Sequence, residues 1–202
     1  MRAGRAAAIV LAAGESSRMV GRFKLLRTIA GEAMVRLPVS AAVRAGLDPI
    51  LVVVGHRAAE VREALADLPV QILENRDYRE GVATSVAIAL DALKGDPAAE
   101  AAVILLGDEP GIRARTIIRV LDKWRDSAAQ AVRVEYRDRP GHPVLIDRSA
   151  FTKLEGLEGD RGLRDRLFGS GEEACQASVD EDAPIDVDTE EAFHAAVARL
   201  QQ

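Results

Sequence analysis

The residues with the clearest chemical potential follow a short apolar run near the start of the chain, in LAAGESSRM and the KLL after it. Gly14 permits a tight backbone turn, and successive amide groups in such a turn can bind phosphate oxygens. Arg18 and Lys24 would neutralise the phosphate charge. The segment has neither the Walker A pattern G-x-x-x-x-G-K-[ST] nor the dinucleotide pattern G-x-G-x-x-G. Two interpretations stay open: another kind of phosphate-binding loop, or an ordinary strand–helix turn with a solvated Arg and Lys.

A second candidate is Asp108, which ends the nearly continuous apolar run in VILLGDEP. If this strand neighbours the first one, the carboxylate lies beside the phosphate loop, where it would suit a magnesium ion. The alternative is that Asp108 caps a helix that begins near Pro110. We expect the next residue, Glu109, to be solvated.

Two more carboxylates lie near the end of the chain, in the sequence IDVDT. In an extended segment Asp186 and Asp188 point to the same face, so either one can complete a metal site with Asp108. The alternative for Asp188 is to cap the last helix.

The histidines and the single cysteine offer less. His142 lies in RPGHPV, where two prolines and a glycine restrict the backbone, and it could hydrogen-bond a substrate. His56 and His194 have ordinary settings, and we expect His194 on a helix surface. Together with Cys175 they show no zinc-site spacing and no case for a Ser-His-Asp triad. We expect Cys175 to pack as a small apolar residue.

The elements that must position these residues alternate between strand and helix through the first two thirds of the chain. This alternation predicts a three-layer α/β fold with a mostly parallel, doubly wound sheet, in which ligands bind at the carboxyl ends of the strands. Pro38 lies inside an expected helix, which it either kinks or starts late. The expected strands are 6–11, 49–54, 70–73, 102–106, 131–136, 142–146 and 176–179. The expected helices are 33–45, 58–68, 83–93, 112–127, 161–168 and 189–200.

Composition bounds the classes of protein. The 202 residues fit a single domain, 1–202, and the 48% hydrophobic but 3% aromatic content predicts a core of Ala, Val, Leu and Ile. The net charge of −5 argues against a general nucleic-acid binder. No apolar run approaches the roughly 20 residues that span a bilayer. The run 6–13 meets the pattern of a secretory signal only loosely, so we favour a buried strand and a cytoplasmic protein.

Read together, LAAGESSRM and KLL resemble the L-A-A-G-x-S-x-R-M-G…K-L-L signature of nucleotidyltransferases with a glycosyltransferase-A-like fold. Within that group the chain is most similar to the molybdenum cofactor cytidylyltransferases and their close relatives, and the resemblance covers almost the whole chain. The other matching elements are Gly55 after the second strand, Asn75…Gly81-x-x-x-Ser85, Gly107-Asp108-Glu109-Pro110, Gly141-His142-Pro143, Gly159-Asp160-Arg161-Gly162 and Asp186-Val187-Asp188-Thr189.

The resemblance implies transfer of CMP from CTP to the phosphate of the molybdenum-pterin cofactor, with release of pyrophosphate and with Mg²⁺ as the metal. It implies catalytic roles for Arg18, Lys24 and Asp108, and metal ligation by Asp108 and Asp188, with Asp186 as the substitute for Asp188. The implied acceptor-binding residues are His142, Asp160 and Gly162. The implied nucleotide-binding residues are Leu11, Ala12, Ala13, Gly14, Ser16, Gly55, Asn75, Gly81, Ser85 and Gly107.

Some features depart from the family pattern and keep alternatives open. Val20 is an extra residue between Met19 and Gly21, which puts the position of Lys24 in question, and Glu109 replaces the commoner Gln or Met. A guanylyltransferase of the same cofactor that uses GTP, or a nucleotidyltransferase for another small phosphate ester, would share the motifs. An alternative of another class is a non-catalytic carrier or insertion chaperone for a molybdenum hydroxylase, which would not need the set Arg18, Lys24, Asp108 and Asp188.

Overall fold

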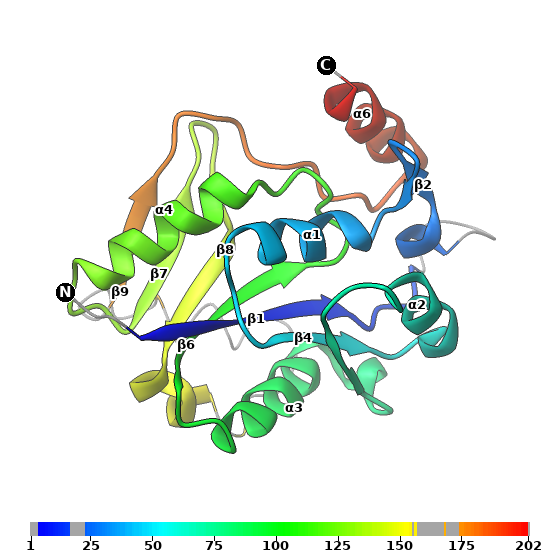
Figure 1. Cartoon of the computed structure of the whole chain (residues 1–202). Coiled ribbons are helices and arrows are strands. Elements are labelled where there is room, and N and C mark those ends of the chain that lie inside the picture. Colours follow the sequence, from blue (N-terminus) through cyan, green and yellow to red (C-terminus); the bar gives the residue numbers. More distant parts are fainter. Residues whose placement is uncertain (1–3, 17–22, 155, 157–167, 169–173, 202) are drawn as a thin grey trace.

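The computed structural model describes residues 4–16, 23–154, 156, 168 and 174–201. Within them, seven strands form one sheet in the order β5-β4-β1-β6-β8-β7-β9, with helices on both faces (Figure 1). The strands are β1 Arg5–Ala12, β4 Ile50–Val54, β5 Gln71–Glu74, β6 Ala99–Leu106, β7 Ala131–Glu135, β8 Pro140–Asp147 and β9 Ala174–Ser178. The helices are α1 Arg36–Arg44, α2 Ala58–Ala64, α3 Val82–Lys94, α4 Ala114–Arg125 and α6 Glu190–Leu200. Smaller elements are η1 Lys24–Leu26, β2 Thr28–Ile29, β3 Glu32–Ala33, η2 Tyr78–Glu80 and η3 Arg148–Leu154.

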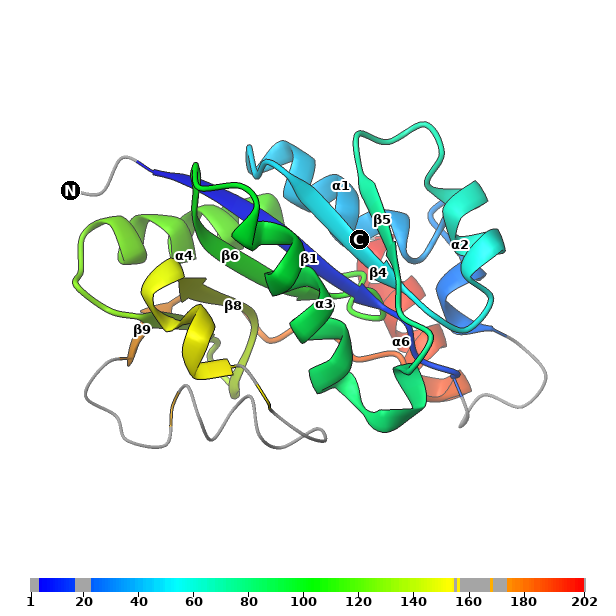
Figure 2. The ribbon, with the colours of Figure 1, turned by 90° about the horizontal axis from the view of Figure 1, so that it is seen from below.

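The opening apolar run is the central strand β1, which confirms the strand interpretation. Its side chains alternate between two cores. Val10 belongs to the core that includes buried residues of α1 and α4, and Ile9 to the one that includes buried residues of α3. Because both faces are covered by helices, the strand reads as a continuous apolar run rather than an alternating one. Figure 2 shows α3 lying across the face of the sheet opposite α1.

The sheet is mostly parallel, as predicted. Strands β5, β4, β1 and β6 run parallel, so their carboxyl ends meet at one edge. Strand β8 is antiparallel to β6 and β7, which confirms the expected strand pair, and β9 is parallel to β7. The antiparallel pairing brings the beginning of β8 to the carboxyl end of β6.

Several expected boundaries are wrong by a few residues. The first helix begins at Arg36 rather than at residue 33, and Ala33 belongs to β3. Pro38 thus falls in the first helical turn, where the missing N–H leaves no hydrogen bond unmade, so the proline delays the helix rather than kinking it. Helix α2 ends at Ala64 rather than at residue 68.

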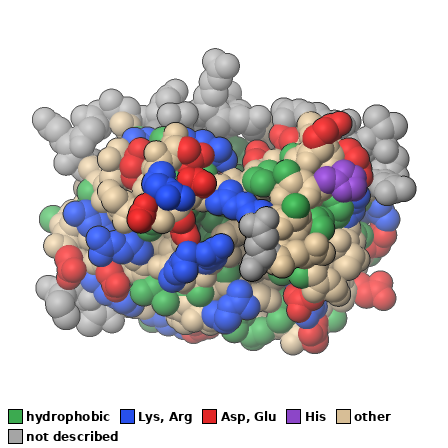
Figure 3. Space-filling model, turned by 90° about the horizontal axis from the view of Figure 1, so that it is seen from above, with side chains coloured by type: hydrophobic (Ala, Val, Ile, Leu, Met, Phe, Trp, Pro, Cys, Tyr) green, Lys and Arg blue, Asp and Glu red, His purple; other side chains and the backbone are tan. Residues whose placement is uncertain are grey.

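The last helix begins as the sequence indicates. The Thr189 hydroxyl accepts a hydrogen bond from the Ala192 amide at 3.2 Å, so Thr189 is the N-cap. The expected helix 161–168 falls almost entirely outside the described residues. Among the described helices, none combines the length and the apolar composition needed to cross a membrane. Seen from above, the surface carries Lys and Arg side chains interspersed with Asp and Glu side chains (Figure 3).

Candidate active site

A cleft opens at the carboxyl ends of β1 and β6. All of its lining residues except Leu25 are ones that the sequence singles out. They are Leu11, Ala12, Gly14, Ser16, Lys24, Leu25, Asp108 and Asp188.

The cleft follows from the pairing of two neighbouring strands. Leu11 of β1 lies beside Leu106 of β6, so the loops that leave the two strands start together. The Gly107 amide donates to the Leu11 carbonyl at 2.9 Å and extends this pairing by one residue. Asp108 therefore lies beside the first loop, as expected for a strand that neighbours β1. The capping alternative for Asp108 is wrong, because the N-cap position of α4 is Arg113.

Asp108, Asp186 and Asp188 form a carboxylate cluster, which we call the acidic triad. One oxygen from each residue lies within 4.8 Å of the others. The Val187 amide donates to the Asp108 carbonyl at 3.1 Å and fastens the two segments together. The capping alternative for Asp188 is wrong, since Thr189 is the cap. Three carboxylates with oxygen donors are the ligand type that Mg²⁺ and Mn²⁺ prefer, so the donor set fits a divalent cation.

Lys24, at the start of η1, contacts the same cluster. Its Nζ donates to Asp108 Oδ2 at 2.6 Å and to Asp188 Oδ1 at 2.7 Å, and its side chain is only 9% exposed. Burial alone lowers the pKa of Lys24, but Asp108 and then Asp188 outweigh burial, so the pKa is raised above its ordinary value. The lysine is a fixed positive charge in the cleft, whatever the effect of the extra residue Val20.

The crowding of negative charge also changes Asp186. Partial desolvation of its carboxyl group, followed by the charges of Asp108 and Asp188, raises the pKa of Asp186 to about 6. A cluster of like charges is costly unless a cation neutralises it. The site is therefore built to hold positive charge, which Lys24 supplies in part.

A second loop, 75–81, lies at the carboxyl end of β5 and next to the first loop. Arg79 Nε donates to Glu15 Oε1 at 2.7 Å, which joins this loop to the one that follows β1. Gly55, at the end of β4, packs against the ring of Tyr78. The expected nucleotide-binding residues Gly55, Asn75 and Gly81 thus lie in segments at the same sheet edge as the cleft.

Asn75 and Ser85 are buried, and their side chains bond to each other. The Asn75 amide Nδ2 donates to Thr84 Oγ1 and Ser85 Oγ, both at 2.9 Å, and Oδ1 accepts from the Asp77 amide at 2.9 Å. Asn75 is 0% and Ser85 3% exposed. In this arrangement the two side chains help to fix the shape of loop 75–81.

We expect Asn75→Ala to lower the free energy of unfolding by about 1–3 kcal/mol, because it leaves buried polar groups without partners. Chemical denaturation of the purified variant measures this change. Arg76→Ala is the matched control, since the Arg76 side chain is 87% exposed and next in sequence. A loss below about 0.5 kcal/mol for Asn75→Ala, the size of an ordinary surface substitution, would contradict this role.

Glu109 differs from its expectation. It is 7% exposed rather than solvated, and its Oε1 lies 3.8 Å from His142 Nδ1. The reason is the antiparallel pairing of β6 with β8, in which Ile104 lies beside Val144. Residues that follow β6 therefore approach residues that precede Val144. His142 itself is half-buried at this place, beside the turn that carries Asp108.

The remaining candidate residues either lie outside the described residues or have the setting that the sequence predicts. Ser17, Arg18, Asp160 and Gly162 lie outside the described residues, so their roles stay predictions. His194 is exposed on α6, as expected. Cys175 is half-buried against the core with its Sγ 3.8 Å from Ser127 Oγ, as expected of a small apolar residue.

Sequence reasoning missed three features of the site. It gave no role to Leu25, to the Glu15–Arg79 bond or to the burial of Glu109. Leu25 could have been found from the sequence, because it directly follows Lys24. The other two depend on which strands pair, and no short motif reports that.

Comparisons with known proteins identify the family to which the chain is similar. The model of the MobA-like NTP transferase domain matches residues 8–174. The bifunctional protein GlmU of Anaeromyxobacter dehalogenans (strain 2CP-1) is 39% identical over 175 residues, 79% of this chain and 35% of that protein. The chain spans only 26% to 35% of the length of the first curated relatives it matches.

Two solved structures are similar over nearly the whole chain. Rv0371c from Mycobacterium tuberculosis H37Rv has a TM-score of 0.86 and 30% identity, covering 98% of this chain and 100% of that one. Rv0371c in complex with manganese has a TM-score of 0.80 and 28% identity, with 98% and 100% covered. The mostly parallel sheet with helices on both faces is the α/β fold of the nucleotidyltransferases. The chain belongs to the MobA-like NTP transferase domain family.

Proposed function

We propose that the protein transfers a nucleoside monophosphate from a nucleoside triphosphate to a phosphate-bearing acceptor and releases pyrophosphate. One observation carries the proposal: Lys24 reaches both Asp108 and Asp188 in a cleft that the first loop also lines. This set combines a fixed cation for phosphate oxygens with carboxylates for a divalent metal ion. The finer proposal is CMP transfer from CTP to the molybdenum-pterin cofactor, and it rests on the resemblance of the G-H-P and G-D-x-G elements.

The proposed reaction needs no general base. A phosphate monoester has its second pKa near about 6, so at neutral pH the acceptor phosphate is already an anionic nucleophile. The difficulty is to bring two anions together, and catalysis rests on positioning and charge neutralisation. Lys24, together with Arg18, binds the triphosphate and the developing pyrophosphate charge, and the backbone of the loop at Gly14 holds phosphate oxygens.

The acidic triad has the second task. Asp108, Asp188 and Asp186 would hold Mg²⁺ or Mn²⁺, which when bound supplies positive charge to the triphosphate oxygens. We assign loop 75–81, at the same edge of the sheet, to the base and sugar of the triphosphate. We assign His142, which lies beside Glu109, to the acceptor. We further propose that residues 1–202 act as one domain. Because the reaction consumes a nucleoside triphosphate, we propose a cytoplasmic location.

The glycines of the two loops give a matched pair of expected results. An added Cβ at Gly14 meets no atom within 4 Å, whereas one at Gly55 meets the Tyr78 ring at 2.8 Å and the Ala13 carbonyl at 2.9 Å. We expect Gly14→Ala to keep its stability but to raise KM for the triphosphate about tenfold, because the methyl group stands where phosphate binds. Gly55→Ala should instead lose about 1–3 kcal/mol of stability by overpacking.

Thermal unfolding and steady-state kinetics of both variants check this pair. Gly95→Ala is the control, because its added Cβ meets its nearest atom at an ordinary 3.6 Å. If the KM of Gly14→Ala for the triphosphate were unchanged, the first loop would not be the phosphate-binding loop.

The test of the function is pyrophosphate release from CTP, GTP and ATP with Mg²⁺ and the molybdenum-pterin cofactor. Release with CTP supports the cytidylyltransferase. Release with GTP alone keeps the reaction and changes the base. Release only with another phosphate ester as acceptor changes the substrate, and bound cofactor with no release under any donor points to a carrier or to an insertion chaperone for a molybdenum hydroxylase.

A further inference from the structure

The segment that carries Asp186 and Asp188 has no regular secondary structure of its own. Residues 179–189, which we call the strap, connect β9 to α6. Two backbone bonds fix its ends: Val179 donates to the Glu135 carbonyl at 3.0 Å, and Val187 to the Asp108 carbonyl at 3.1 Å. Between these points the Arg137 amide donates to the Glu181 carbonyl at 3.1 Å, but the strap belongs to no strand, so side-chain contacts must also determine its path.

Two arginines bind three consecutive carbonyl groups in the middle of the strap. Arg199, from α6, donates to the Ala183 and Asp182 carbonyls, each at 2.8 Å. Arg139, from the turn between β7 and β8, donates to the Pro184 carbonyl at 2.9 Å. Because a guanidinium offers several donors in a fixed plane, these bonds set the direction of the backbone as well as its distance.

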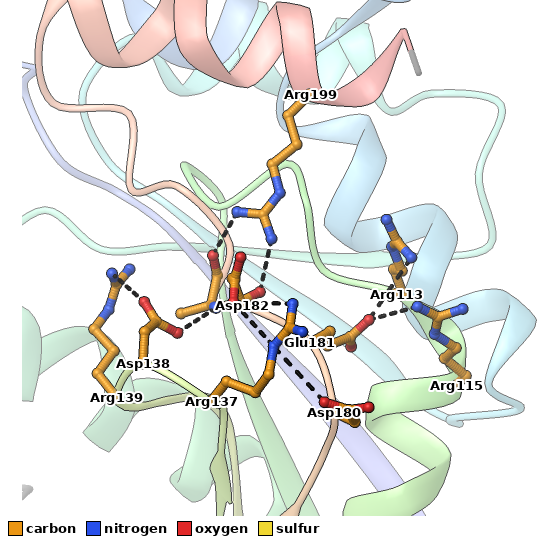
Figure 4. A network of polar contacts seen from close by, with 10 residues as sticks. Arg113, Arg115, Arg137, Asp138, Arg139, Asp180, Glu181, Asp182 and Arg199 are labelled. Atoms are coloured by element: carbon orange, nitrogen blue, oxygen red, sulfur yellow. Dashed lines mark hydrogen bonds and ion pairs between the residues drawn. The ribbon is translucent and has the colours of Figure 1, made fainter.

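Further contacts hold the strap on its other sides (Figure 4). Asp138 Oδ1 accepts from the Ala183 amide at 2.8 Å, and this bond lowers the pKa of Asp138. The Glu181 side chain accepts from Arg115 at 2.6 Å, at the start of α4. Asp182 pairs with Arg137 at 3.1 Å. Side chains from α4, from the β7–β8 turn and from α6 therefore converge on residues 181–184.

The helix that supplies Arg199 is fixed at its other end. Arg27 makes two bonds to the Glu190 carboxylate, at 2.6 and 2.7 Å, and its guanidinium lies 3.3 Å from the centre of the Phe193 ring. Helix α6 is thus attached to Arg27, which directly follows η1, and η1 contains Lys24. Arg199 binds the strap from a support that is itself joined to the site.

The acidic triad needs such support because its charges repel. Asp186 and Asp188 each have an oxygen within 4.8 Å of an Asp108 oxygen, so their like charges repel. Lys24, which bonds to Asp108 and Asp188, offsets part of this repulsion, and the remainder favours movement of the strap away from β6. Residues 182–184 are two to six positions before these carboxylates, close enough in sequence for their backbone position to set where the carboxylates lie.

We infer that Arg139 and Arg199 are positioning residues of the acidic triad: they hold the strap so that Asp186 and Asp188 stay beside Asp108. The inference rests on the proposed function only in taking the triad as the metal-binding group. The two arginines act through the strap backbone and have no place in the chemistry of transfer. Their removal weakens metal binding without removing a ligand.

The test is Mn²⁺ binding, measured as free Mn²⁺ by electron paramagnetic resonance without nucleotide. We expect the double variant Arg139→Met/Arg199→Met to bind Mn²⁺ at least tenfold more weakly than the wild type. Arg148→Met is the matched control, because Arg148 also donates to several carbonyl groups, including Asp96 and Ala99, but at the opposite end of β6. The Arg148→Met variant should be less stable than the wild type but should bind Mn²⁺ with the same affinity. Arg199→Lys, which keeps the charge with fewer directed donors, should fall in between.

The outcomes separate the two proposals. Mn²⁺ affinity within twofold of the wild type in a folded double variant would overturn the positioning role. A loss of affinity as large in Arg148→Met would do so too, because general destabilisation would then explain it. A wild type that binds no Mn²⁺ overturns the metal site and this inference together. Normal Mn²⁺ behaviour with no pyrophosphate release from any triphosphate would overturn the proposed function alone.

Discussion

Asp108→Asn should lower kcat/KM for pyrophosphate release by a factor of about 10²–10³ while the protein stays folded. The substitution keeps the size of the side chain and removes the charge at the end of β6, where the triad meets Lys24. Asp108 is 24% exposed, and residues 101–105 of the strand before it are buried without its help, so the fold should not depend on this carboxylate. Steady-state kinetics with Mg²⁺, together with circular dichroism, measure the two effects separately.

The control for this result is Asp122→Asn. Asp122 is also an aspartate of the described structure, but it is half exposed on α4 and pairs only at 3.4 Å with Arg125 of the same helix. It should keep wild-type kinetics. If Asp108→Asn turned over at close to the wild-type rate, Asp108 would not be a metal ligand. The proposed metal-dependent chemistry of the cleft would then be contradicted.

Lys24→Met should also cost about 10²–10³ in kcat/KM, since it removes the charge that neutralises the triphosphate but keeps the length of the side chain. The variant should fold, because Asp108 and Asp188 are 24% and 33% exposed and water can solvate them. Mn²⁺ should raise its Tm by more than it raises the Tm of the wild type, because the ion then supplies positive charge that the lysine supplied before.

Lys94→Met tests whether loss of any lysine has these effects. Lys94 is half exposed at the end of α3 and forms a pair with Asp91. Its variant should match the wild type in turnover and in the Mn²⁺-dependent shift of Tm. Unchanged turnover in Lys24→Met would mean that another cation of the first loop binds the triphosphate.

The sequence predicted the part of the site that depends on strand ends. An apolar run that stops at a glycine or an aspartate indicates both a buried strand and the place where its loop begins, so Gly14 and Asp108 were found from their neighbours alone. Lys24 and Asp188 were singled out by residue type, as a cation for phosphate and a carboxylate for a metal, but nothing near them in sequence shows that they contact each other. The alternation of strands and helices gave the mostly parallel sheet for the same local reasons.

The rest depends on contacts between distant segments. Glu109 is polar and follows a strand, which predicts exposure, but the beginning of β8 lies beside it, with His142 3.8 Å away, and the side chain is buried. Asn75 has a side-chain amide of the kind that binds ligands, but this amide donates to Thr84 and Ser85. Arg139 and Arg199 look like ordinary surface arginines in sequence, and only the path of the strap shows what they bind.

The contacts of Lys24 also have a consequence for how the chain is made. Lys24 joins Asp108 across 84 positions and Asp188 across 164 positions of the sequence. Closing such long loops is slow and costs chain entropy, so the site forms after the local helices and strands. During synthesis the first strands can pack well before Asp188 leaves the ribosome. A chain synthesised only as far as residue 185 therefore lacks two of the three carboxylates of the acidic triad.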